Sequence, residues 1–94
     1  MGLTWSRSAT RHRISRDRSR FVIEHCGLVF EEEARVGAPV AAVPRLVYLG
    51  DDRDGVALEV MAVELEDGDL LVIHAMALRD RYREQYEEAK RWRR

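Results

Sequence analysis

The sequence predicts a single α+β domain that spans residues 1–94, with an N-terminal helix (or two short helices), a three- to four-stranded antiparallel sheet and a C-terminal helix. Three observations support this class. A length of 94 residues, 46% of them hydrophobic, suits one small domain. Short apolar segments separated by turn residues fill the centre of the chain. Apolar residues at helical spacing occur at both ends.

The first helix is expected over residues 16–25. Ser15 is a suitable N-cap, because its hydroxyl can accept a hydrogen bond from a free backbone N–H of the first turn. Asp17 lies in that turn, where a negative charge suits the helix dipole, and Gly27 is well placed to end the helix. The polar and basic residues 3–13 before it allow a short strand or a helical turn.

Four segments rich in β-branched and aromatic residues predict the strands. Asp67-Gly68 is a two-residue hairpin signal between the last two of them. Residues 34–44 contain a glycine and two prolines and are expected to form an apolar loop that packs on the domain or contacts a partner. The expected strands are residues 28–30, 45–50, 56–66 and 69–78.

Residues 79–94 predict a C-terminal helix, because apolar residues recur there at close to helical spacing. Tyr82 and Tyr86 are expected to pack this helix on the sheet rather than to stack on bases. Trp92 has basic neighbours and is expected either to anchor the helix or to form an exposed contact.

The hairpin signal also predicts a register, and with it two conspicuous polar residues. Side chains alternate between the faces of a strand, so Glu59 and His74 share one face, about 7–8 Å apart on a diagonal. They are expected to form either a structural pair or an acid–base pair that lines a groove, with partner binding as a third reading. The expected pairs are Leu65–Leu70, Val63–Val72, Met61–His74, Glu59–Met76 and Ala57–Leu78. Both faces of this hairpin are mainly apolar, which predicts a sheet covered on both sides.

The net charge of −1 hides a strong segregation of charge along the chain. Residues 1–23 have six arginines and one aspartate, residues 24–69 have twelve acids and three arginines, and residues 79–94 have seven bases and four acids. The two basic ends either meet to form a positive patch for phosphates or pack beside the acidic middle.

The composition argues against several classes of protein. The single cysteine, Cys26, cannot form an internal disulfide and suits a reducing cytosol. The longest strongly apolar segment, residues 70–78, is far shorter than the roughly 20 residues that cross a membrane. The histidines and Cys26 lack zinc-site spacing, and no glycine-rich phosphate loop occurs. We therefore expect a cytoplasmic protein without a metal or cofactor.

Two short segments carry a family resemblance. The first resembles the Lys-His-Gly-Ile/Val-Ser stretch before the main helix of the BrnT-type toxins, a RelE-like group. The second is similar to their last strand, which ends in Ile-Ser-Ala-Arg before a helix with Glu-Arg-x-x-Tyr-Glu. The segments are Arg11-His12-Arg13-Ile14-Ser15 and Val72-Ile73-His74-Ala75-Met76, the latter followed by Arg79, Arg81, Tyr82, Tyr86 and Glu87.

This resemblance implies a compact RelE-like fold and the role of toxin in a type II toxin–antitoxin module. It further implies metal-free RNA cleavage and neutralisation by an antitoxin with a ribbon-helix-helix DNA-binding domain, with the complex repressing its own operon. RNA and this antitoxin are therefore the expected partners, and an oligomer with the antitoxin is the expected assembly. The family has Ser and then Arg on the last strand, where this chain has His74 and Met76.

The candidate catalytic residues for this function are His74, Glu59, His12 and Arg79. The 2′-hydroxyl of RNA would attack the adjacent phosphorus, with His74 or His12 as base or acid and Glu59 as orienting group or acceptor. Guanidinium groups just beyond the strand or in the N-terminal segment would hold the phosphate. The candidate nucleic-acid-binding residues are Arg11, Arg13, Arg81 and Arg91.

Two other functions stay open on the sequence. One is a non-catalytic module of the same fold that binds a protein partner through the sheet face or the loop at residues 34–44. The other is a nucleic-acid-binding domain without cleavage that uses the two basic ends and predicts steeply salt-dependent binding.

Overall fold

The computed structural model describes residues 2–33 and 44–92. Nearly all of the expected loop at residues 34–44, and the last two residues of the expected C-terminal helix, lie outside these ranges. The elements are β1 (Leu3–Trp5), the 3-10 helix η1 (Arg7–Thr10), α1 (Arg16–Glu24), β2 (Leu28–Glu32), β3 (Arg45–Asp51), β4 (Ala57–Glu64), β5 (Leu70–Ala77) and α2 (Asp80–Trp92).

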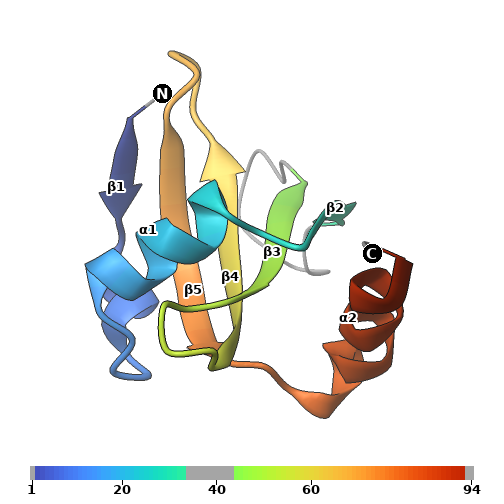
Figure 1. Cartoon of the computed structure of the whole chain (residues 1–94). Helices are drawn as coiled ribbons and strands as arrows, with labels where there is room; N and C mark the ends of the chain where they lie inside the picture. Colours follow the sequence, from blue (N-terminus) through green and yellow to red (C-terminus); the bar gives the residue numbers. More distant parts are fainter. Residues whose placement is uncertain (1, 34–43, 93–94) are drawn as a thin grey trace.

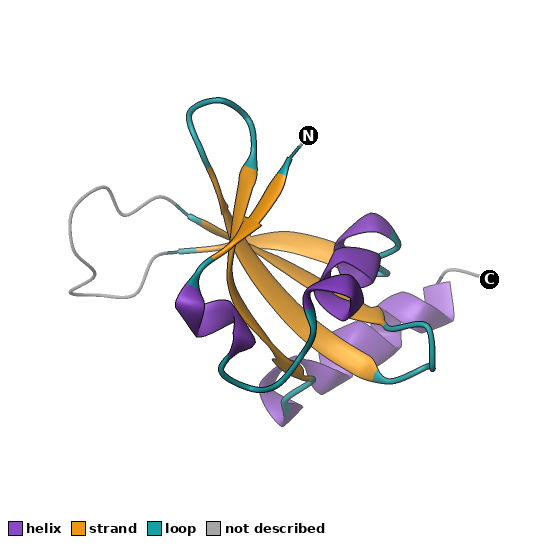
Figure 2. Cartoon of the chain, turned by 90° about the vertical axis from the view of Figure 1, so that its left-hand side faces the viewer, coloured by secondary structure: helices purple, strands orange, loops and turns teal. Residues whose placement is uncertain are grey.

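The α+β class is confirmed, but the sheet has five strands and is mixed, in the order β1-β5-β4-β3-β2. The prediction of a three- to four-stranded antiparallel sheet is therefore wrong. The additional strand is β1, which pairs in parallel with β5 and places Leu3 opposite Leu70. A three-residue strand has too few residues for alternation to be visible, and its partner lies far away in the sequence. Viewed from the β1 side, the strands fan out because the sheet is strongly twisted (Figure 2).

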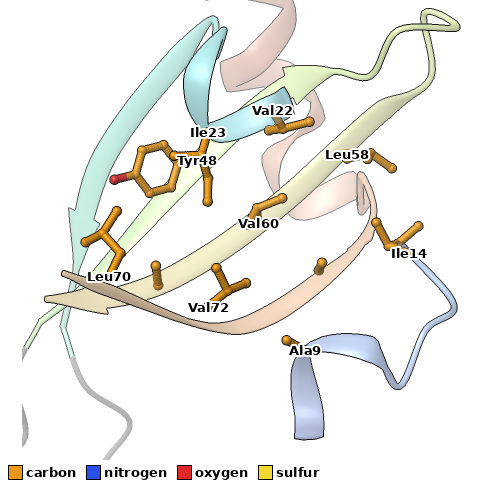
Figure 3. Packing of buried hydrophobic residues seen from close by; sticks show 11 residues of the cluster. Ala9, Ile14, Val22, Ile23, Tyr48, Leu58, Val60, Leu70 and Val72 are labelled. Atoms are coloured by element: carbon orange, nitrogen blue, oxygen red, sulfur yellow. The ribbon is translucent and has the colours of Figure 1, made fainter. Parts of the chain in front are cut away.

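Helix α1 covers one face of the sheet, and its start is set by a side chain. The Ser15 hydroxyl accepts a hydrogen bond from the Arg18 N–H at 3.2 Å, as the N-cap prediction requires. Val22 and Ile23 then point from the helix onto the sheet (Figure 3). The chain leaves the helix at His25, and the Gly27 N–H donates to the Leu49 carbonyl at 3.0 Å, which leads the chain into β2.

Helix α2 covers part of the opposite face and stands to one side of the sheet (Figure 1). Tyr82 and Tyr86 are buried there against Val47, Leu49 and Met61. Packing of both tyrosines on the sheet is as predicted, and the sheet is covered on both sides over β3 and β4. Within the described ranges, neither helix has the length and apolar character needed to cross a bilayer.

The β4–β5 hairpin differs from the predicted one at its turn. The Leu65 N–H donates to the Asp69 carbonyl at 2.8 Å, so the loop has three residues and ends in Gly68 at φ +89°. This shifts the register near the turn by one residue, and a bulge that leaves Ile73 unpaired restores it. The predicted pairs Met61–His74 and Glu59–Met76 are therefore confirmed, whereas Val63–Val72 and Leu65–Leu70 are wrong.

Candidate functional site

A buried carboxylate forms the centre of the candidate site. Glu59 on β4 has no exposed surface, and each of its oxygens accepts hydrogen bonds from neighbouring groups. His74 Nε2 lies 3.0 Å from Oε2. The Arg79 side chain donates to the same oxygen from Nε at 2.9 Å and from Nη2 at 2.7 Å, and its backbone N–H donates to Oε1 at 2.9 Å. The carboxylate therefore ties the end of β5 to the start of α2.

These hydrogen bonds keep Glu59 ionised. Burial by itself raises the pKa of this carboxyl, but the hydrogen bonds from His74 and Arg79 and the Arg79 charge lower it from 4.5 to about 2. An ionised carboxylate only accepts, so the proton of the contact with His74 resides on Nε2. Within the described residues, Nδ1 of His74 makes no hydrogen bond. It is thus the atom of this imidazole that can exchange a proton.

The bulge on β5 and the 3-10 helix η1 bring a second imidazole to His74. The Ser8 hydroxyl donates to the carbonyl of the unpaired Ile73 at 2.7 Å, which fixes η1 at the bulge. The chain then turns so that the His12 ring meets the His74 ring edge-to-face, with centroids 5.6 Å apart. Arg13 follows in the left-handed region at φ 63°, a strained conformation for a residue with a side chain.

The structure thus gathers the four side chains predicted as catalytic from three separate parts of the sequence: the segment after η1, β4, and the end of β5 with the residues just beyond it. Glu59 lies at the base, and the side chains above it reach solvent, with 21% of His74 and 39% of Arg79 exposed. His12 is exposed. Two imidazoles and one guanidinium on a charged support are able to move protons and to stabilise a developing negative charge on one ligand.

The four residues predicted to bind nucleic acid are not gathered in the same way. Arg11 and Arg13 are exposed on either side of His12. Arg81, by contrast, donates to Glu32 at 3.3 Å and lies over the Tyr82 ring. Arg91 is twelve residues beyond Arg79, which places it about 18 Å along the α2 axis. Arg11 and Arg13 therefore flank His12, Arg81 shares the Tyr82 ring with Arg79 but is paired with Glu32, and Arg91 lies away from the cluster.

Acidic residues of the middle segment form hydrogen bonds and ion pairs with side chains of α2. The sequence left this arrangement as one of two alternatives, the other being a positive patch formed by the two basic ends. Glu32 accepts a hydrogen bond from the Tyr82 hydroxyl at 2.7 Å and also pairs with Arg45. Asp51 accepts from Tyr86 at 2.6 Å and from Lys90 at 3.4 Å. Sequence reasoning did not identify Glu32 as an anchor for α2. The only signal for it was its position at the end of a short strand.

Comparisons with known proteins add no family to this geometry. A scan against protein-family models found no match, and neither did a search of curated proteins or a search of solved structures. Within residues 2–33 and 44–92, no three side chains of His, Cys, Asp or Glu gather in the manner of metal ligands. Function is therefore inferred from the residues of this chain and their arrangement.

Proposed function

We propose that this chain is a metal-free RNA endonuclease and the toxin component of a type II toxin–antitoxin module. The observation that carries the proposal is the His74 imidazole, held through Nε2 by the buried Glu59 and placed beside His12 and Arg79. Transfer of a phosphodiester to its own 2′-hydroxyl needs a base, an acid and a cation, and this cluster offers all three.

In the proposed reaction, Nδ1 of His74 accepts the proton of the 2′-hydroxyl as that oxygen attacks the adjacent phosphorus. His12, in its protonated form, gives a proton to the leaving 5′-oxygen. One phosphorus–oxygen bond forms and one breaks, and the products are a 2′,3′-cyclic phosphate and a 5′-hydroxyl. Arg79 stabilises the charge on the non-bridging oxygens, and Glu59 orients both His74 and Arg79 without touching the substrate.

The resemblance to BrnT-type toxins also supports the proposal through one backbone angle. The family stretch Lys-His-Gly-Ile/Val-Ser has glycine at the position of Arg13, and Arg13 is the non-glycine residue with positive φ among those described. A turn that needs φ 63° explains why glycine suits this position. We extend the proposal accordingly to a RelE-like fold, a ribbon-helix-helix antitoxin as partner and a cytoplasmic location.

A non-catalytic binding module of the same fold is the second candidate. The observation in its favour is that Glu59 is fully buried and that both of its carboxylate oxygens already accept hydrogen bonds. This is expected of a structural pair between the sheet and α2. The two candidates differ in what His74 does, because a structural pair needs only its contact with Glu59, whereas a base also needs a free Nδ1.

The test is inducible expression of the chain with and without the adjacent gene, with growth and RNA integrity as readouts. We expect growth arrest and cleaved RNA that the adjacent gene suppresses. His74→Ala should abolish both, since loss of a general base slows catalysis by about 10²–10⁴. His25→Ala is the matched control, because His25 is exposed and stacks on Phe21 rather than on the cluster.

Undiminished toxicity of a folded His74→Ala chain would remove His74 from the mechanism. Expression of the original chain without a growth defect, together with tight binding to the product of the adjacent gene, would favour the binding module instead.

A further inference from the structure

The two basic ends of the chain differ in how their charges are compensated. In α2 and just before it, the bases Arg79, Arg81, Arg83 and Lys90 all contact carboxylates. In the N-terminal segment, Arg18 pairs with Asp52 at 2.9 Å. The other arginines of that segment are exposed, and none forms an ion pair within the described part of the chain: Arg7, Arg11, Arg13, Arg16 and Arg20. Among the described residues, arginines without an ion pair are therefore concentrated in the N-terminal segment, and Arg53 and Arg91 are the exposed ones outside it.

Two of these arginines are arranged around one indole. The guanidinium carbons of Arg16 and Arg20 lie 5.6 and 5.2 Å from the centre of the Trp5 ring. Trp5 is fixed by β1 and by its indole N–H, which donates to the Ser19 hydroxyl at 2.9 Å. We call Trp5, Arg16 and Arg20 the Trp5 clamp.

The geometry of the clamp leaves hydrogen-bond donors unused. A guanidinium stacks on an aromatic ring through its flat face, so its N–H groups at the edge stay available. Arg16 and Arg20 are four residues apart on α1, and like charges at this spacing repel each other and destabilise a helix. An anion between them would relieve this repulsion, and the stacking on Trp5 reduces the entropy lost when the anion binds.

We propose that the Trp5 clamp binds the phosphate backbone of single-stranded RNA next to the cleavage site. This inference rests on RNA as the proposed substrate. His12 precedes Arg16 by four residues, so the two α-carbons are at most about 14 Å apart. Arg13 lies between them and is exposed. One RNA strand can therefore extend from the cluster of His12 and His74 to the clamp.

A single strand fits this surface better than a duplex. Proteins that bind single strands combine a positive surface along the backbone with aromatic rings or guanidinium planes on which unpaired bases stack. The clamp provides both elements within three residues, and it lies on α1 and the edge strand β1. Five uncompensated arginines predict a strong dependence of binding on salt.

The test measures binding of the full chain to a fluorescent 2′-O-methyl RNA, which lacks the attacking hydroxyl and so is not cleaved. The affinity is followed over a range of salt concentrations for the original chain and for the double variant R16A/R20A. We expect the slope of log K against log salt to fall by about 1.4 in magnitude, since each lost contact removes about 0.7 for a single strand. A duplex RNA should bind more weakly than the single strand.

The matched control is R83A/R91A, which removes two exposed arginines of α2, on the opposite face of the sheet from α1. It should leave the slope unchanged. Equal losses in the two double variants, duplex binding as tight as that of the single strand, or heparin binding with the same dependence on Arg16 and Arg20 would each overturn the inference. His74→Ala should keep the slope, so failure of cleavage and failure of the clamp are distinguishable.

Discussion

Glu59 shows how a charged side chain is kept inside the protein. Its carboxylate has no contact with solvent, which by itself costs several kcal/mol, and hydrogen bonds from His74 and Arg79 offset this cost. The same contacts set the tautomer of His74 and the direction of the Arg79 side chain. One residue thus contributes both to stability and to the orientation of the proposed catalytic groups.

Replacement of Glu59 by glutamine tests this role through pH. The folded-state pKa of about 2, against an ordinary 4.5, corresponds to about 3 kcal/mol of stabilisation, which is complete above pH 4.5 and is lost as the pH falls towards 2. We expect Glu59→Gln to lower the free energy of unfolding by about 3 kcal/mol at neutral pH and to reduce its decline between pH 4.5 and 2, the rest of which is due to Glu32 and Asp52, whose pKa values are also lowered. Urea unfolding at several pH values measures both effects. A variant whose stability declines as steeply as that of the original chain in that range would show that Glu59 does not contribute to the pH dependence.

At the level of elements, the segment between η1 and α1 positions His12, and its conformation carries strain. Ser8 fixes η1 to the β5 bulge, Ser15 caps α1, and Arg13 between them adopts φ 63°. An L-residue in the left-handed region costs roughly 1–2 kcal/mol, so the contacts at both ends of the segment must offset this cost. The bulge and the turn together define how the two imidazoles meet.

Arg13→Gly should therefore stabilise the protein. Glycine adopts φ 63° without steric cost but loses more backbone entropy on folding, which leaves a net gain of about 0.5–1 kcal/mol. Thermal unfolding should show a higher midpoint by several degrees. Arg11→Gly is the control: Arg11 has φ −59°, so glycine there relieves no strain and should not stabilise. A rise in the midpoint for both variants would point to loss of charge rather than relief of strain.

At the scale of the whole molecule, α2 is held mainly by tyrosines whose hydroxyl groups reach acidic strand ends. Tyr82 donates to Glu32 at the end of β2, and Tyr86 donates to Asp51 at the end of β3. Because Arg79 immediately precedes α2, the position of this helix also determines whether the guanidinium reaches Glu59. The proposed site and the docking of the helix therefore depend on each other.

Tyr82→Phe tests the helix anchor. Burial and the hydrogen bond to Glu32 raise the pKa of Tyr82 from 10 to about 12, so its contribution is complete below pH 10 and is lost as the pH rises through 12. We expect the variant to lose about 2 kcal/mol at neutral pH and to show a smaller decline in alkali. Hydrogen exchange in α2 should rise together with the loss. Tyr48→Phe is the control at neutral pH, since the Tyr48 hydroxyl makes no hydrogen bond within the described residues. Equal losses of unfolding free energy in both variants would contradict the role of the Tyr82 hydroxyl as an anchor of α2.

Features that depend on local chemistry can be inferred from the order of the residues. The Ser15 hydroxyl is suited to one end of a helix wherever that helix packs, and alternation of apolar residues gives β3, β4 and β5 without knowledge of their neighbours. The sequence also identified Glu59 and His74 as unusual, because a polar residue on an apolar strand needs a partner.

Features that depend on contacts between distant residues are visible only in the folded chain. The pairing of β1 with β5, the bulge at Ile73 and the choice of carboxylate partner for each arginine result from competition among many long-range contacts of similar energy. Such contacts leave no periodic pattern in a single chain. For this reason the sequence showed two basic ends, whereas the structure pairs most of the described bases in and just before α2 with carboxylates and leaves five of the six N-terminal arginines without an ion pair in the described part of the chain.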